Sequence, residues 1–375
     1  MILPGATLGM LGSGQLGRMF ALAAARLGYR TAVLAQSADD PAAQIAHQTF
    51  LTGDDPVQAA QEFAQHCAVV TLEFENIDPA IADAVASVCP LHPGASVLRI
   101  AQDRGEERRF LDAIGAPTAR HRVITTAQEA ATAHAELGPG LIFKTCRSGY
   151  DGRGQVRLGP DSDAREAFGK LGSLPCLAEA VVPFERELSV ILARTESGEV
   201  AVYPPFHNVH RNHILDVTEW PAPDLPDGVG ARAEDLARSI ADGLGMVGML
   251  CVEMFLEPDG TLLVNELAPR PHNSGHVTIE AAWTDQFEQQ VRAVTGLPLG
   301  STRPRQPGAM VNLLGDVFAH GTPDWPQVVA CPTAKLHLYG KLEARPGRKM
   351  GHLTVLDDDP REAANRARQL RERLA

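Results

Sequence analysis

The chain has 375 residues, of which 44% are hydrophobic, and a formal net charge of −12 at pH 7. It is long enough for two or three domains with hydrophobic cores, and its acidity argues against a protein that coats nucleic acid. No apolar run approaches a membrane span, and six cysteines without a Cys-x-x-Cys pair indicate reduced thiols in a cytoplasmic protein.

The N-terminus predicts a βαβ unit. Residues 7–11 form the first strand, a helix ends at Leu27, and residues 31–34 form the second strand. Residues 12–17 between them have the spacing GxGxxG, whose amides can hold a phosphate at a helix N-terminus. A dinucleotide site also needs an acid after the second strand, where this chain has Gln36. We therefore favour a structural turn or another phosphate ligand over NAD.

Residues 69–74 predict another strand, which ends among polar side chains. Glu73 and Glu75 stand where parallel sheets present side chains to ligands. Acids that cap the helix beginning at Asp78-Pro79 are an equally good interpretation of this spacing.

A charged helix begins at residues 102–104 and ends at Gly115-Ala116-Pro117, and most of its charges are expected to face solvent. The strand predicted over 141–144 ends in Lys144. It leads into the glycine-rich residues 147–155, which lack the order of a P-loop. A lysine before such a loop fits a phosphate contact with a closing lid, and an ordinary hairpin loop is the alternative.

Residues 177–182 predict a strand that contains Glu179 and is followed by Glu187. The edge of an apolar strand can present backbone N–H and C=O groups to an adenine. A nearby carboxylate can bind ribose hydroxyls. His207 and His210 have no metal partner at a standard spacing.

Two apolar runs separated by Pro258-Asp259-Gly260 predict a β-hairpin. A turn centred on Pro258-Asp259 places Glu253 opposite Val264, with Glu266 two residues further along and on the same face. Two acids at one spot require a cation, and hard oxygen ligands favour Mg²⁺ held together with phosphates. An exposed hairpin is the alternative, but the polar residues from 265 to 276 favour a site.

A proline- and arginine-rich linker follows Gly300, and strands follow the linker. Four cations then occur within nine residues: Lys341, Arg345, Arg348 and Lys349. In an acidic protein this group fits a phosphate clamp. A solvated basic loop is the alternative.

Together these motifs resemble the ATP-grasp superfamily and, within it, the 5-(carboxyamino)imidazole ribonucleotide synthases of purine biosynthesis. The similar segments span nearly the whole chain in family order: GSGQLGRM (12–19), LEFEN (72–76), QDR (102–104), GYDGRGQ (149–155), AEAVVPFERELS (178–189), YPPFHNVH (203–210), CVEMF (251–255), VNELAPRPHNSGH (264–276) and HLYGKLEARPGRKMGH (337–352).

The resemblance implies an α/β fold of the ATP-grasp type. It implies an N-terminal Rossmann-like (pre-ATP-grasp) domain at 1–95, an ATP-grasp domain at 96–300 with a lid subdomain at about 115–180, and a small C-terminal β-rich domain at 301–375. The last of these would carry the basic phosphate-binding loop.

The resemblance also implies the site residues. For ATP binding these are Arg104, Lys144, Gly149, Tyr150, Asp151, Gly152, Arg153, Gly154, Gln155, Glu179, Ala180, Val181, Val182, Glu187, His210, Asn265 and Glu266. For substrate binding they are Gln15, Leu16, Glu73, Glu75, Tyr150, Lys341, Arg345, Arg348 and Lys349. Glu253 and Glu266 would bind the metal, and the catalytic residues would be Asp151, Arg153, Arg270 and Asn273.

The implied activity is ATP- and bicarbonate-dependent carboxylation of 5-aminoimidazole ribonucleotide through carboxyphosphate. Mg²⁺, or Mn²⁺ in its place, would assist. The family resemblance further implies a cytoplasmic homodimer whose product is used by a carboxyaminoimidazole ribonucleotide mutase, with neither nucleic acid nor membrane as a partner.

Three other functions compete with this one. Another ATP-grasp ligase acting on a phosphoribosyl amine, similar to formate-dependent glycinamide ribonucleotide transformylase, is the nearest. A nicotinamide-dependent dehydrogenase lacks its expected acid after the second strand. A catalytically inactive nucleotide sensor is disfavoured because Lys144, Glu253 and Glu266 are retained.

Overall fold

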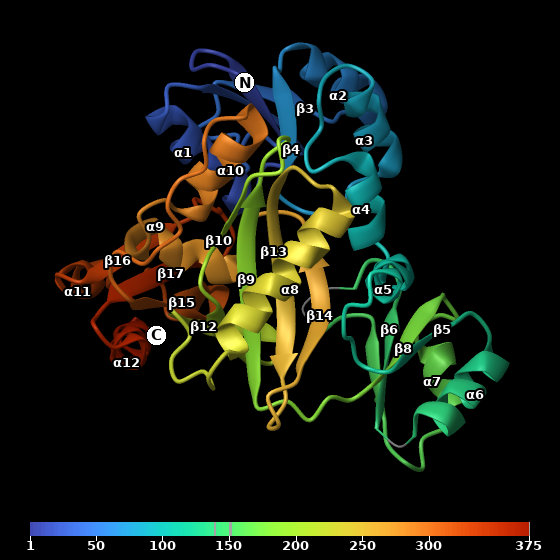
Figure 1. Ribbon diagram of the computed structural model, residues 1–375. Helices are drawn as coiled ribbons and strands as arrows, with labels where there is room; N and C mark the ends of the chain where they lie inside the picture. The colour runs from blue at the N-terminus through green and yellow to red at the C-terminus, as the bar shows by residue number, and fades with distance from the viewer. Residues whose placement is uncertain (139, 150–151, 375) are drawn as a thin grey trace.

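The computed structural model describes residues 1–138, 140–149 and 152–374, which form three β-sheets with flanking helices (Figure 1). One sheet lies at the N-terminal end, a small sheet with two helices projects to one side, and a large sheet fills the rest. Tyr150 and Asp151, both predicted site residues, lie outside the described residues.

The N-terminal sheet is parallel, with the strand order β3-β2-β1-β4. Its elements and the helices around it are β1 (Thr7–Leu11), α1 (Gln15–Arg26), β2 (Arg30–Ala35), β3 (Gln48–Leu51), α2 (Pro56–Gln65), β4 (Val69–Leu72), α3 (Pro79–Ala86) and α4 (Ala95–Ala101). Strand β1 is buried almost throughout because helices cover both faces of a parallel sheet. The predicted βαβ unit is confirmed, with the glycine-rich turn between β1 and α1.

The small sheet is antiparallel and has the order β5-β8-β6-β7. Helix α5 (Arg104–Ala113) precedes it, and its own elements are β5 (His121–Ile124), α6 (Ala127–Leu137), β6 (Leu141–Thr145), β7 (Gln155–Leu158), α7 (Ala164–Lys170) and β8 (Cys176–Ala180). Phe143 and Phe168 belong to its core. The glycine-rich loop joins β6 to β7, so Lys144 lies beside the loop. Strand β8 ends two residues earlier than predicted.

The large sheet has nine strands in the order β14-β13-β9-β11-β12-β15-β17-β16, with β10 paired to β9. Its elements and their helices are β9 (Arg186–Arg194), β10 (Val200–Val202), β11 (Phe206–Arg211), β12 (Ile214–Trp220), α8 (Val229–Leu244), β13 (Gly248–Leu256), β14 (Leu262–Ala268), η1 (Asn273–Val277), α9 (Thr278–Ala281), α10 (Gln286–Thr295), β15 (Gly308–Leu314), η2 (Gly315–Phe318), α11 (Trp325–Val329), β16 (Ala334–Leu338), β17 (Lys349–Leu356) and α12 (Pro360–Glu372). The C-terminal strands continue this sheet, because β15 pairs with β12.

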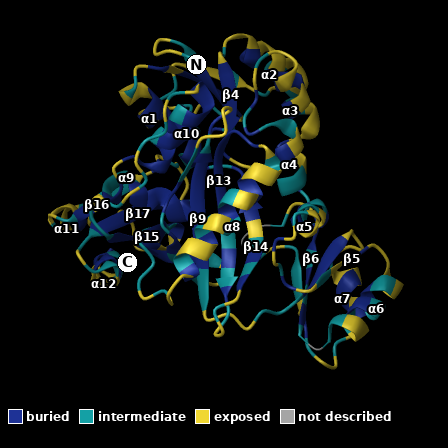
Figure 2. Cartoon of the chain, viewed as in Figure 1, coloured by how far each residue is buried: buried dark blue, intermediate teal, exposed yellow. Residues whose placement is uncertain are grey.

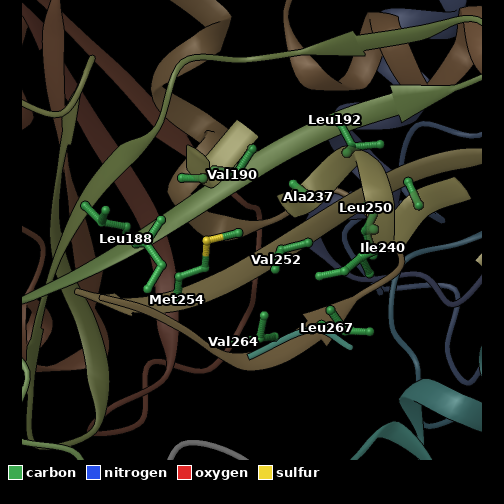
Figure 3. Close-up of a cluster of buried hydrophobic side chains, with 14 of the residues drawn as sticks. Leu188, Val190, Leu192, Ala237, Ile240, Leu250, Val252, Met254, Val264 and Leu267 are labelled. Carbon is green, nitrogen blue, oxygen red and sulfur yellow. The ribbon is translucent and has the colours of Figure 1, made fainter. Parts of the chain in front are cut away.

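Opposite faces of β9 and β13 pack against different helices. Leu250, Val252 and Met254 join α8 residues in one buried cluster (Figure 3). Met249 and Cys251 point to the other face and join a cluster that includes α10. Buried residues therefore run through the sheet, and most of the exposed ones lie on its outer helices and loops (Figure 2). None of the helices in the described part of the chain is both long and apolar enough to cross a membrane.

The predicted hairpin is present, but its predicted register is wrong. Met254 pairs with Val264, and a β-bulge then places Glu253 directly opposite Glu266. The connecting loop, residues 257–261, has an odd length, closed by a bond of 2.9 Å from the Glu257 N–H to the Thr261 carbonyl. An odd loop alone would have put the acids on opposite faces, and the extra residue in β14 restores a common face.

The side chains of β14 reflect this bulge. Leu262, Val264 and Leu267 all belong to the buried cluster beneath the sheet (Figure 3). Strict alternation would have put residue 266 there in place of Leu267. The bulge therefore keeps the Glu266 carboxylate out of the core.

Candidate active site

Glu253 and Glu266 form a pair of facing carboxylates on β13 and β14. The Glu253 side chain is partly buried, and His272 Nε2 lies 2.9 Å from its Oε1. Burial opposes ionisation, but His272 outweighs it and holds the pKa of Glu253 at about 2. Desolvation by the surrounding protein, and then the charge of Glu253, raise the pKa of Glu266 to about 7. The residue nevertheless keeps part of its surface exposed. Such a pair fits a divalent cation, which would relieve the repulsion between the two carboxylates.

Behind this pair lies a buried ion network. Lys144 Nζ is 2.6 Å from Glu179 Oε2, and Arg108 Nη2 is 2.8 Å from Glu179 Oε1. Arg108 also bonds Glu107 at 2.9 Å, and only 2% of its side chain is exposed. Burial raises the pKa of Glu179, but Lys144 and Arg108 overcome this and lower it below its ordinary value. Two of the predicted ATP-binding residues, Lys144 and Glu179, are thus in direct contact.

Glu107 and Arg108 were missed in the sequence, where the charges of α5 are expected to face solvent. For these two residues that expectation is wrong. Leu111 marks the buried face of α5, and residues three and four positions before it share that face. This periodicity could have identified the buried face of α5. It does not predict that charged side chains on that face are buried as ion pairs.

The glycine-rich loop is tied to α5 at its start. Arg104 donates from Nη1 to the Thr145 carbonyl at 2.9 Å and from Nη2 to the Gly149 carbonyl at 3.2 Å. Gly154 has φ +69, and a Cβ there would lie 2.5 Å from Thr145 Oγ1. Glycine is therefore required at this point. Gln155 follows and pairs with Lys144 across the two strands.

The predicted adenine and ribose residues lie along β8 and β9. Val181 donates its N–H to the Gly140 carbonyl at 3.0 Å, so an adenine would be bound by the neighbouring groups of Ala180 and Val182. Glu187 pairs with His210 across β9 and β11. Burial lowers the pKa of His210, but the hydrogen bond to Glu187 is stronger and raises it above its ordinary value.

A cavity of about 510 Å³ lies between the N-terminal sheet and the basic loop, and it brings together residues about 330 positions apart in sequence. Four predicted substrate-binding residues line it: Gln15, Glu73, Lys341 and Arg348. Burial and then the neighbouring Arg348 lower the pKa of Lys341 to about 8. A cavity with two cations at its rim suits a phosphorylated ligand.

The glycine-rich turn at the edge of this cavity already holds an anion. Glu73 accepts hydrogen bonds from the amides of Gly14 at 2.5 Å and Gly17 at 2.8 Å. These are the amides that could have bound a phosphate at the N-terminus of α1. A Cβ at Gly14 would lie 2.9 Å from the same carboxylate. The turn is therefore a structural one, closed by Glu73.

Arg270 lies near both the cavity and the Glu253–Glu266 pair. It bonds Glu75 through two nitrogens, at 2.5 Å and 3.2 Å. Its charge acts on Glu73 at the cavity and on Glu253 in the hairpin. Asn273 lies three residues further on, and its side-chain oxygen and nitrogen are both buried without a partner among the described residues. Polar atoms of this kind are suited to a bound ligand.

The remaining predicted residues contribute to these groups less directly or in other ways. Leu16 belongs to the N-terminal core, so only its backbone could reach a ligand. Arg345 is exposed and bonds Glu343, with its Nε at 3.0 Å. Lys349 begins β17, and its carbonyl accepts a bond of 2.7 Å from Lys341. Arg153 and Gly152 follow the undescribed part of the loop. Asn265 is the bulge residue.

Comparison with known domain families divides the chain into three matching parts. Residues 5–102 match the ribonucleotide synthetase preATP-grasp domain, residues 109–287 match the ATP-grasp domain, and residues 308–366 match the phosphoribosylaminoimidazole carboxylase C-terminal domain. These matches correspond in order to the N-terminal sheet, the region that carries the ion network and hairpin, and the C-terminal strands.

Curated relatives and solved structures match over nearly the full length. The N5-carboxyaminoimidazole ribonucleotide synthase of Bacillus subtilis (strain 168) is 42% identical over 356 residues, which cover 95% of this chain and 93% of the relative. That of Brucella melitensis biotype 1 is 43% identical, over 94% of this chain and 96% of the relative.

Two crystal structures place the fold in the same group. The N5-carboxyaminoimidazole ribonucleotide synthetase of Thermus thermophilus superimposes with a TM-score of 0.90 at 38% identity, over 98% of each chain. The N5-carboxyaminoimidazole synthase of Aspergillus clavatus, in complex with ADP and 5-aminoimidazole ribonucleotide, gives a TM-score of 0.88 at 33% identity, over 98% of each chain. The chain therefore belongs to the N5-carboxyaminoimidazole ribonucleotide synthase family of ATP-grasp ligases.

Proposed function

We propose that the chain carboxylates the exocyclic amine of 5-aminoimidazole ribonucleotide, using ATP and bicarbonate, to give 5-(carboxyamino)imidazole ribonucleotide for purine biosynthesis. The observation that carries this proposal is the ion pair between Arg270, two residues after the hairpin strand β14, and Glu75, whose neighbours Phe74 and Asn76 line the cavity. An enzyme that transfers a carboxyl group between a nucleotide site and a ribonucleotide site needs a cation at this junction.

ATP would lie between the small sheet and the hairpin. Lys144 and Arg104 would contact its phosphates, and the loop containing Gly149 and residues 152–155 would cover them. Ala180 and Val182 would bind the adenine, with Glu187 and His210 near the ribose. Lys144 would exchange part of its contact with Glu179 for a phosphate oxygen.

Mg²⁺, or Mn²⁺, would be held by Glu253, Glu266 and the ATP phosphates, with Asn265 nearby. Bound there, the ion would neutralise charge that develops on the phosphates. The residues fit such an ion because one carboxylate is ionised and its neighbour is kept partly protonated by desolvation and then by repulsion. Glu266 would lose its proton on binding the ion.

The ribonucleotide would occupy the cavity beside the glycine-rich turn. Lys341 and Arg348 would hold its 5′-phosphate, and Gln15 would contact the rest of the molecule. Arg345 and Lys349 would add positive charge to the same loop. Glu73 and Glu75 would act on the site mainly through the glycine turn and Arg270, because their carboxylates are already bonded there.

The proposed reaction has two steps. A bicarbonate oxygen attacks the γ-phosphorus, the bond to the β-phosphate oxygen breaks, and carboxyphosphate and ADP form. The exocyclic amine then bonds to the carboxyl carbon, phosphate leaves, and the amine loses a proton. Arg270 and Asn273 would hold the bicarbonate, and Arg153 would stabilise the intermediate. Asp151, which lies outside the described residues, remains the proposed proton acceptor.

The finer biological setting is also a proposal. A homodimer, a cytoplasmic location and use of the product by a carboxyaminoimidazole ribonucleotide mutase are supported by the family resemblance. So is a division into domains at 1–95, 96–300 and 301–375. Sedimentation equilibrium would test the dimer, and a monomer at micromolar concentration would contradict it.

Phosphate release from Mg·ATP tests the reaction. With 5-aminoimidazole ribonucleotide in CO₂-free buffer, we expect release that depends on added bicarbonate. Release that instead requires glycinamide ribonucleotide and formate would support the nearest alternative. Hydrolysis indifferent to either pair of substrates would reject both.

A further inference from the structure

We propose that Glu107 and Arg108 on α5 are positioning residues that hold β14 in its bulged register and thereby fix Glu266 opposite Glu253. This inference deepens the proposed function, because it rests on the assignment of these two glutamates to a metal. It concerns two residues that belong to none of the proposed ATP-binding, substrate-binding or metal-binding sets.

The first step is a pair of backbone contacts on either side of Glu266. Arg108 Nη2 donates to the carbonyl of Asn265 at 2.6 Å. The N–H of Leu267 donates to Glu107 Oε2 at 2.8 Å. Two consecutive residues of one helix thus hold both peptide groups that flank the metal-binding glutamate.

The second step is the reason why these peptide groups need partners. At the bulge β14 has one residue more than β13, so the extra residue is not paired within the strand ladder. Buried peptide groups without a partner are costly. The Arg108 guanidinium supplies a donor for the carbonyl of this extra residue, Asn265, and the Glu107 carboxylate supplies an acceptor for the N–H of Leu267 on the open edge of β14. They therefore favour the bulged register over a regular strand.

The third step is rigidity. The Arg108 guanidinium is fixed by Glu107 at 2.9 Å and by Glu179 at 2.8 Å, in a site where only 2% of its side chain is exposed. Glu179 in turn holds Lys144 at 2.6 Å. The same guanidinium thus links the metal-bearing strand to the lysine proposed to bind the ATP phosphates. Nucleotide and metal would be positioned by one buried group.

Helix α5 supplies a matched control. Its neighbouring residues Glu106 and Arg109 also form an ion pair, at 2.8 Å, but both are largely exposed. Exposed pairs of this kind contribute little to stability. The double variant Glu106→Gln/Arg109→Met therefore removes the same two charges from the same helix without touching β14.

The test variant is the double change Glu107→Gln/Arg108→Met. It removes one charge of each sign, so no net buried charge is added, and the amide oxygen that replaces the Glu107 carboxylate can still accept from Leu267. Arg108→Lys is the conservative companion, because it keeps a buried positive charge that can reach a carbonyl. If the double variant fails to fold, Glu107→Ala alone carries the same measurements, because it leaves the Leu267 N–H without its acceptor while Arg108 keeps Glu179.

Two readouts need no turnover. In ligand-free protein, we expect amide hydrogen exchange over residues 264–268 to rise by about tenfold or more in the double variant, since it reports local opening. With saturating ADP, we expect the Mn²⁺ dissociation constant, measured by electron paramagnetic resonance, to rise about 10- to 100-fold, as for other residues that orient metal ligands. Arg108→Lys should keep both the amide exchange and the Mn²⁺ dissociation constant close to those of the original protein.

The control variant should keep the amide exchange and the Mn²⁺ affinity of the original protein. The test variant should keep the affinity of the original protein for 5-aminoimidazole ribonucleotide. Unchanged exchange and unchanged Mn²⁺ affinity in the test variant would overturn the proposal, since pairing with β13 alone would then hold the register. Equal losses of Mn²⁺ and ribonucleotide binding would also overturn it, because they would show a general defect. If the protein did not carboxylate 5-aminoimidazole ribonucleotide, the exchange and Mn²⁺ measurements could still be made and interpreted. The proposed function and the positioning role can therefore be rejected independently.

Discussion

At the scale of single residues, the site is governed by carboxylates whose neighbours decide their charge. Glu253 is kept ionised by His272, and Glu266 is driven toward protonation by desolvation and then by the charge of Glu253. Glu73 is stabilised by two amides although burial raises its pKa. Similar side chains therefore differ in charge state and partners, as an ionised carboxylate beside His272, a titrating carboxylate and a cap on the turn before α1.

The metal assignment predicts a severe defect in Glu266→Gln. Loss of one of two carboxylate ligands should lower the rate of ATP turnover by roughly 1000-fold, since metal stabilisation of the transferring phosphoryl group amounts to several kcal/mol. Steady-state phosphate release would measure it. Rates close to those of the original protein would contradict the assignment.

Glu73 should contribute measurably to stability. Glu73→Ala leaves the Gly14 and Gly17 amides without their acceptor, and an unsatisfied buried group costs about 1–3 kcal/mol. Urea unfolding monitored by circular dichroism should show this loss in the free energy of unfolding. A midpoint equal to that of the original protein would mean that water replaces the carboxylate at no cost.

Lys341 should make substrate binding depend on pH. Its pKa is lowered to about 8 in the free protein, so it is charged below that pH and loses its charge above it. We expect the KM for 5-aminoimidazole ribonucleotide to rise between pH 7.5 and about 9, and the Lys341→Arg variant, which stays charged, to flatten this rise. The same KM in the original protein across this range would show that the lysine is not a phosphate ligand.

At the scale of elements, the β13–β14 hairpin shows what the sequence could and could not predict. Apolar runs around Pro-Asp-Gly identify the hairpin, and its polar C-terminal end identifies the site. The register was out of reach because the bulge is held by α5, about 160 residues earlier in the chain. Likewise, the filling of the glycine turn by Glu73 depends on strand order in the sheet, which local spacing does not specify.

The basic loop shows the same limit. Its four cations are close in sequence, but the fold separates them: Lys341 and Arg348 line the cavity, whereas Arg345 is exposed beside Glu343. We therefore expect Lys341→Ala to raise the KM for the ribonucleotide by about 10-fold or more, and by more than Arg345→Ala does. The KM for ATP should stay within about twofold in both variants. Equal effects of Lys341→Ala on both substrates would argue against a separate phosphate site.

At the scale of the whole molecule, segments from opposite ends of the chain build one site. Gln44 Nε2 donates to the Gly340 carbonyl at 2.9 Å, close to the cavity that Gln15 and Lys341 share. The continuous sheet from β14 to β16 joins the hairpin to the C-terminal strands (Figure 1). The cavity therefore exists only when the N-terminal sheet and the C-terminal loop are both in place.

Ligands should consequently protect distant segments together. We expect 5-aminoimidazole ribonucleotide alone to slow amide exchange at residues 12–17 and 339–349 at once, and ADP alone to slow it around 140–149 and 179–187. Protection of only one segment by the ribonucleotide would place its site outside the shared cavity.

The central claim is that bicarbonate attacks the γ-phosphate before the carboxyl group reaches the amine. Turnover with bicarbonate labelled with ¹⁸O, followed by mass analysis of the phosphate released, tests this most directly. The account predicts one ¹⁸O atom in each phosphate, because the oxygen that attacks phosphorus leaves with it. Unlabelled phosphate, formed together with 5-(carboxyamino)imidazole ribonucleotide, would contradict a carboxyphosphate intermediate.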